Sequence, residues 1–122
     1  MEKKLDTQTT LEDVKVFIKK FIHERDWDKF HNAKNLSMGM SIEAGELMEH
    51  FLWTDTADVQ KTFEANQQDI EDELADVIIV AICFANQYNI DINTIITKKM
   101  AKNALKYPIE KSKGVATKYT KL

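Results

Sequence analysis

Two pairs of acidic residues have a spacing that places carboxylates side by side on a helix. Glu43 and Glu46 are three residues apart, and so are Glu73 and Asp76. Side chains at this spacing project from the same face of a helix. Carboxylate oxygens are ligands that Mg²⁺ and Mn²⁺ favour, with water and phosphate oxygens completing the coordination. The spacing indicates a candidate metal site, while a solvated helix face remains the alternative for either pair alone.

The residues around the first pair favour a functional site. Glu43, Glu46 and His50 fall on the same helical face as four apolar residues, which are Leu36, Met40, Leu47 and Phe51. A buried, unpaired carboxylate costs several kcal/mol, so these groups must be protonated, paired or bound to a cation. Gly39 and Gly45 each lower helix propensity by about 1 kcal/mol relative to alanine. They predict that a neighbouring helix or a ligand packs closely there.

The second pair stands at the head of a markedly apolar segment. Glu73 and Asp76 come just before the run 77–85. This run is apolar on nearly all sides of a helix, so we expect it at the centre of a helical bundle. If the two acidic helices pack antiparallel, four carboxylates converge. A dinuclear iron bundle would instead require Glu-x-x-His pairs. No histidine here has a glutamate three residues before it, which disfavours iron.

Helices are the elements expected to position these residues. Only three glycines and one proline interrupt the chain, and strand-like alternation is absent. Thr9 and Glu12 have capping-box spacing at the first helix, Asp91 is a suitable cap for the last, and Pro108 ends it. The predicted helices cover about residues 10–25, 35–53, a short polar stretch, 68–88 and 91–107. The fold class is all-α, a four-to-five-helix bundle with an extended tail at 109–122.

Length and composition limit the class of protein. The 122 residues predict a single domain, 1–122, and a net charge of -3 argues against a nucleic-acid partner. One cysteine, Cys83, excludes an internal disulfide and fits a reducing compartment. No segment has the length of a membrane span, and the start lacks the apolar core of a signal peptide. We expect a cytoplasmic protein that acts on a small molecule, without a membrane partner.

A family resemblance rests on the same motifs. Glu43-Ala44-Gly45-Glu46-Leu47 followed by Glu73-Leu74-Ala75-Asp76-Val77 resembles the paired motifs of the MazG-like, all-α NTP pyrophosphohydrolases. Further segments resemble the dCTP pyrophosphatase branch in the same order. These segments are Glu24-Arg25-Asp26-Trp27-Asp28-Lys29-Phe30-His31, Lys34-Asn35-Leu36, Phe51-Leu52-Trp53, Lys106-Tyr107-Pro108 and Lys118-Tyr119-Thr120. The resemblance runs from about Val16 to Leu122.

The resemblance implies a fold, an activity and a cofactor. It implies a bundle of the all-α NTP pyrophosphohydrolase type that assembles through its helices into dimers or tetramers. The implied reaction converts a nucleoside triphosphate to the monophosphate and pyrophosphate, with cytosine deoxynucleotides as the first expectation and nucleotide-pool house-cleaning as the role. Magnesium, or manganese in its place, would be held by four carboxylates, those of Glu43, Glu46, Glu73 and Asp76.

The resemblance also implies substrate contacts. Trp27, His31 and Trp53 are expected near the base and sugar, since indole rings stack well on a nucleobase, although such residues also serve in packing. Near the end of the chain Lys99, Asn103 and Lys106 share one helical stripe, and these three with Tyr107 are expected at the phosphates. A solvated lysine face is the alternative.

Several functional questions stay open at the level of sequence. Glu46 is the preferred general base that activates water, and Glu49 and Glu71 are alternatives. Residues 17–21 lack the histidine that some relatives place near the base, so the base preference is unsettled. A non-catalytic, oligomeric nucleotide-binding or interaction module is the alternative function, and magnesium-dependent hydrolysis separates it from an enzyme.

Overall fold

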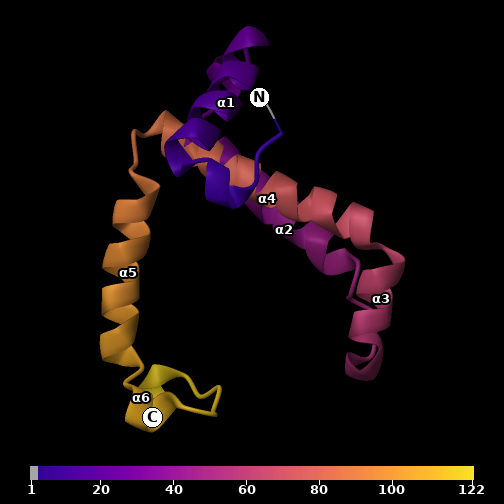
Figure 1. Cartoon of the computed structure of the whole chain (residues 1–122), viewed down its shortest axis with the longest axis vertical. Helices are drawn as coiled ribbons and strands as arrows, with labels where there is room; N and C mark the ends of the chain where they lie inside the picture. The colour runs from indigo at the N-terminus through magenta and orange to yellow at the C-terminus, as the bar shows by residue number, and fades with distance from the viewer. Residues whose placement is uncertain (1–2) are drawn as a thin grey trace. The chain divides into compact units, whose positions relative to one another are not determined.

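The computed structural model describes residues 3–122, and these form α-helices and short 3-10 turns without any strand. The all-α fold class is therefore confirmed (Figure 1). The chain divides into two compact units, one up to Asn89 and one from Ile90. The first holds α1 (Leu11–Glu24), α2 (Ala33–Glu49), α3 (Val59–Ala65) and α4 (Gln67–Gln87), and the second holds α5 (Ile92–Lys106) and α6 (Ile109–Ser112).

The closest pairing of helices in the first unit is between α2 and α4, which run side by side (Figure 1). They are antiparallel, because the backbone N–H of Ala33 at the start of α2 donates to the Tyr88 hydroxyl just after α4, at 2.6 Å. A methyl group at Gly39 would lie 3.7 Å from Val80 Cγ1, which is an ordinary packing contact. No described atom lies within 4 Å of such a group at Gly45. Helix α4 therefore provides the predicted close packing at Gly39, and none of residues 3–122 provides it at Gly45.

The carboxyl-terminal half of α4 also receives α1. Ile18 and Ile22 of α1 are buried, and the Asn86 side-chain amide donates to the backbone oxygen of Lys15 at 3.0 Å. Buried Ile82, Cys83 and Ala85 lie in this half of α4. Ile70, near the start of the helix, is also buried, whereas Leu74, Ile78 and Ile79 are exposed. The expectation that the apolar run 77–85 is central therefore holds only in part among the described residues.

The start of α1 differs from the prediction by one residue. Thr10 is the N-cap: its hydroxyl accepts from the Asp13 N–H at 3.1 Å, and the Asp13 carboxylate accepts from the Thr10 N–H at 3.0 Å. These hydrogen bonds from Thr10 lower the pKa of Asp13. The predicted capping box of Thr9 and Glu12 is wrong, and the Thr9 hydroxyl instead bonds the Asp13 carboxylate at 3.3 Å. Both pairs have the same spacing, so spacing alone does not separate them.

Other predicted boundaries need smaller corrections. Helix α2 ends at Glu49, and the chain continues to Trp53 in turns in which Phe51 N–H donates to the Met48 oxygen at 2.9 Å. Asp91 caps α5 as predicted, accepting from the Thr94 N–H at 3.0 Å. The extended tail predicted for 109–122 is wrong in part, since it contains α6 and a 3-10 turn at Tyr119–Lys121.

No single helix within residues 3–122 combines the length and apolar character that crossing a membrane requires. Only α4 and α5 considered together, as a pair with a break between them, meet that requirement by length and composition.

Candidate active site

The antiparallel pairing of α2 and α4 brings the acidic residues together. Oxygen atoms of Glu43, Glu73 and Asp76 all lie within 4.8 Å of one another. Glu46 is adjacent, because its carboxylate interacts with both Glu43 and Glu73. We call these four residues the carboxylate cluster. It is built from residues 30 positions apart in the chain, and the two pairs meet because each pair faces the seam between the helices.

The carboxylate cluster is electrostatically unsatisfied. Burial, followed by the neighbouring carboxylate of Glu46, raises the pKa of Glu43. Burial also raises the pKa of Glu73, with further contributions from Glu46 and Asp76. One oxygen of each, Oε2, is shielded from solvent and has no hydrogen-bond partner among the described residues. Buried oxygens without partners are rare in folded proteins, so this cluster calls for protons or a cation.

The donor set fits a hard divalent cation. The three clustered residues offer only carboxylate oxygens, with no imidazole or thiolate among them. Glu43 and Glu73 are half-buried and Asp76 is exposed, so the cluster has a shielded side and an open side. An ion held there would remain accessible to solvent or to a phosphate ligand.

An open hollow adjoins the carboxylate cluster, and its lining distinguishes between the candidate residues for the general base. It is lined by Glu46, Glu49, His50 and Glu73. Glu71 does not line it, because its carboxylate is exposed and accepts from the Gln67 side-chain amide at 3.2 Å. Glu46 and Glu49 therefore both line the open hollow, whereas Glu71 is exposed on α4.

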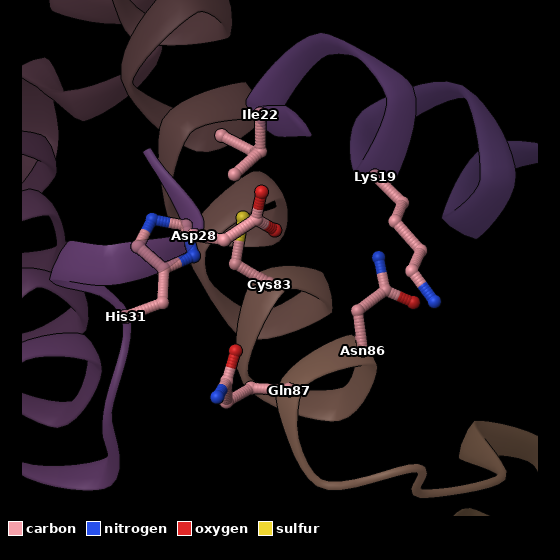
Figure 2. Close-up of a pocket in the computed structure, with 7 residues that line it drawn as sticks. All are labelled: Lys19, Ile22, Asp28, His31, Cys83, Asn86 and Gln87. Atoms are coloured by element: carbon pink, nitrogen blue, oxygen red, sulfur yellow. The ribbon is translucent and has the colours of Figure 1, made fainter. Parts of the chain in front are cut away.

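A second hollow contains His31 and lies between α1, α4 and the turn that precedes α2. Figure 2 shows its lining, which is Lys19, Ile22, Asp28, His31, Cys83, Asn86 and Gln87. Asp28 Oδ2 is also 3.1 Å from His23 Nδ1. Burial raises the pKa of the Cys83 thiol, so that group stays neutral. The carboxylate, imidazole and amide groups together offer donors and acceptors to a polar ligand.

The second hollow lies along α4 from the carboxylate cluster. Cys83 follows Asp76 by seven residues, which is two helical turns and about 10 Å along the same face. Asp28, Asn86 and Gln87 were not singled out from the sequence. The seven-residue spacing from Asp76 is the signal that would have indicated this region of α4, whereas nothing in the local pattern marks Asp28.

The two tryptophans lie at opposite ends of α2. Trp27 precedes the helix, and its ring meets Phe21 edge-on with the centroids 5.9 Å apart. Trp53 follows the helix and is 91% exposed. The 17 residues of α2 span about 25 Å, which is much longer than a nucleobase. One chain therefore does not bring Trp27 and Trp53 to the same base.

The expected phosphate contacts lie in the second unit. Lys99, Asn103 and Lys106 occupy one stripe of α5, in which Lys99 is exposed and Asn103 is half-buried. Lys106 Nζ lies 4.8 Å from the ring centre of Tyr119. The Tyr107 ring meets Tyr119 edge-on at 5.9 Å and 76°. The 3-10 turn near the end of the chain thus folds against the end of α5.

The fold and the carboxylate cluster define an all-helical protein with a candidate divalent-metal site in the seam between two antiparallel helices. The sequence profile of the MazG-like family matches residues 38–122, a span that includes both acidic pairs. The chain belongs to the MazG-like family.

Named relatives agree with this assignment. The chain is 35% identical over 117 residues to dCTP pyrophosphatase 1 of Rattus norvegicus, covering 94% of this chain and 69% of the relative. It is 32% identical to dCTP pyrophosphatase 1 of Homo sapiens with the same coverage. A solved pyrophosphatase from Archaeoglobus fulgidus DSM 4304 matches with 33% identity and a TM-score of 0.78, over 87% of this chain and 99% of that one. The predicted family, and the prediction of a pyrophosphohydrolase enzyme, are confirmed.

Proposed function

We propose that this chain is a metal-dependent pyrophosphohydrolase that converts a deoxynucleoside triphosphate to its monophosphate and pyrophosphate. The observation that carries the proposal is the carboxylate cluster, in which Oε2 of Glu43 and of Glu73 are shielded beside Asp76 and have no hydrogen-bond partner in the part of the chain that the structure describes. The names of the relatives, dCTP pyrophosphatase 1, support both the bond that is cleaved and the substrate class.

The four residues of the carboxylate cluster would hold the metal, for which Mg²⁺ is the first choice and Mn²⁺ a substitute. When bound, the ion supplies positive charge that neutralises phosphate oxygens and so lets a polyanion approach an acidic site. The protein's own part is to fix the carboxylates on two packed helices. Their positions are then set by the α2–α4 seam before substrate arrives.

Glu46 is the proposed general base. It is half-buried, it interacts with both Glu43 and Glu73, and it lines the open hollow beside the cluster. Its carboxylate would accept a proton from a water molecule as the water oxygen attacks the α-phosphorus, and the bond from that phosphorus to the bridging oxygen breaks. Pyrophosphate leaves with the electron pair. Glu49 lines the same hollow and is the remaining competitor for this role.

The nucleoside is proposed to bind at the second hollow, with His31 in its lining and Trp27 directly before the Asp28 that also lines it. This hollow lies about two turns of α4 from Asp76, which is a distance that a nucleotide spans between its α-phosphate and its base. Cytosine is the first choice of base because of the relatives' names. The phosphate contacts proposed for the second unit are Lys99, Asn103, Lys106 and Tyr107.

The charge of the second unit supports a role at the phosphates. Residues 90–122 carry eight lysines against only Asp91 and Glu110, whereas residues 1–89 carry nine basic and eighteen acidic residues. A chain that carries both a basic segment and an acidic segment with a candidate metal site suits a ligand that is a polyanion.

A homo-oligomer, dimer or tetramer, is part of the proposal. Ile42 of α2 and Ile78 of α4 are exposed in the single chain, and Gly45 lacks the neighbour that a glycine within a helix predicts. Apolar helix faces of this kind are typical of subunit contacts. Because Trp27 and Trp53 of one chain are too far apart to share a base, Trp53 would contact a base only in the site of a second copy. A cytoplasmic location and a nucleotide house-cleaning role remain predictions from the sequence.

A substrate panel tests the substrate assignment. Purified protein is incubated with each common NTP and dNTP, with magnesium or with a chelator, and the initial rates are compared. We expect magnesium-dependent hydrolysis that is fastest with dCTP. A faster reaction with another base would overturn the cytosine assignment, and no hydrolysis of any substrate would favour the binding-module alternative.

A further inference from the structure

The open hollow beside the carboxylate cluster contains one residue that the proposed reaction does not yet use. Of the four residues that line it, three are acidic and the fourth is His50. His50 lies one helical turn after Glu46, at the carboxyl end of α2, and is half-buried. Its backbone N–H bonds the Met48 oxygen, which ties the residue to the last turn of the helix.

Among the side chains that line the hollow, the His50 imidazole is distinguished by its ability to donate a hydrogen bond. Ionised carboxylates only accept hydrogen bonds, and phosphate oxygens also accept them. The imidazole always carries at least one N–H, whether it is neutral or protonated, so it is the donor among the lining side chains. A phosphate group that enters the hollow therefore has one protein side chain there to which it can hydrogen-bond directly.

The position of the hollow indicates which part of the substrate it faces. Two hollows flank the carboxylate cluster along α4: one is lined by Cys83 and Gln87, and the other by Glu73. The proposed function assigns the nucleoside to the first. The phosphates beyond the α-phosphate then extend toward the second, where His50 lies.

We propose that His50 is a substrate-binding residue that donates a hydrogen bond to the pyrophosphate portion of the nucleoside triphosphate. This inference rests on the proposed function and assigns a further residue to the same site. It also explains why an imidazole stands among three carboxylates on an otherwise acidic and apolar helix face.

Binding of inorganic pyrophosphate tests the role without requiring turnover. Calorimetric titration with magnesium pyrophosphate is carried out on wild type, on His50→Leu, which lacks a donor, and on His50→Gln, which keeps an N–H donor. His23→Leu is the matched control, because it removes an imidazole that is paired with Asp28 rather than placed at this hollow. Hydrogen bonds to charged groups predict about tenfold weaker pyrophosphate binding for His50→Leu.

Further readouts separate this role from a general structural one. We expect His50→Gln to recover much of the affinity, His23→Leu to bind as wild type does, and magnesium binding in the absence of pyrophosphate to be unchanged in all variants. Loss of magnesium binding in His50→Leu would show that His50 is a metal ligand and would overturn the proposal. Equal pyrophosphate affinity in wild type and His50→Leu, with dCTP hydrolysis intact in wild type, would overturn the role of His50 alone. Absence of hydrolysis by wild type would instead overturn the proposed function.

Discussion

Glu46 is the residue on which the proposed chemistry most depends. Replacing it by glutamine keeps the size of the side chain and removes the group that accepts the proton. We predict that Glu46→Gln lowers kcat by at least about a hundredfold, the usual contribution of a general base. Steady-state kinetics with dCTP and magnesium measure this loss, and circular dichroism checks that the helices persist.

The control for Glu46→Gln is Glu64→Gln. Glu64 is exposed on α3, outside the carboxylate cluster, and accepts from the Gln60 amide at 3.1 Å, so its replacement should leave kcat near the wild-type value. If Glu49→Gln loses activity and Glu46→Gln retains it, the general base is Glu49 instead of Glu46.

The raised pKa values of Glu43 and Glu73 predict how stability depends on pH. A carboxyl whose pKa is higher in the folded state than its ordinary value of 4.5 holds its proton more tightly when folded. The contribution to stability is therefore present at low pH and is lost as pH rises through the raised values. Without metal, we predict that the Tm falls as the pH rises above the ordinary carboxyl value of 4.5.

Glu73→Gln provides the control for this pH dependence, because an amide in its place does not ionise. Thermal unfolding in the presence of a chelator should show a smaller decrease of Tm with pH in this variant than in wild type. If the carboxylate cluster holds magnesium as proposed, adding the ion should raise the wild-type Tm near pH 7, because a ligand that binds only the folded state stabilises it. Identical pH profiles for the two proteins would contradict the account of the cluster.

At the scale of helices, α1 offers a test of the corrected cap. Thr10 satisfies an N–H of the first turn, whereas the Thr9 hydroxyl bonds only a side chain. We predict that Thr10→Ala lowers the free energy of unfolding by about 1 kcal/mol, and that Thr9→Ala has a much smaller effect. Urea unfolding of the two variants measures the difference. A larger loss for Thr9→Ala would restore the capping box first predicted from the sequence.

The sequence predicted which segments are helical but not all of their ends. Helical periodicity is local, so the spans of α1, α4 and α5 follow from the pattern to within one or two residues. The end of α2 was missed because no glycine or proline marks it. The structure of the tail was missed because Tyr119 packs on Tyr107 and Lys106, and contacts between distant residues leave no local pattern.

The same distinction applies to the candidate site. Each acidic pair is visible as a spacing within one helix, and the antiparallel packing that joins the pairs was an inference from the apolar faces. The second hollow combines Lys19, Asp28 and Gln87 from three separate segments, which only the folded chain brings together. Sequence therefore indicated the carboxylate cluster and could not indicate the shape of its surroundings.

At the scale of the whole molecule, exposed apolar residues predict association. Ile42 is 58% exposed and Ile78 is 49% exposed, although both lie on the two helices that carry the carboxylate cluster. We predict that light scattering finds a dimer or tetramer, and that Ile78→Asp shifts it toward the monomer, because burying a charge in an apolar contact is unfavourable. Leu5→Asp, at another exposed apolar residue far from α4 in sequence, is the control and should leave the mass unchanged. A monomeric wild type would contradict the proposed assembly.

The central claim is that the carboxylate cluster supports cleavage between the α- and β-phosphates. The most direct measurement is a separation of products from dCTP and magnesium, for wild type and for Glu73→Gln. We predict that wild type forms dCMP and pyrophosphate and that Glu73→Gln forms neither at a comparable rate. Formation of dCDP and phosphate, or equal rates for the two proteins, would contradict the claim.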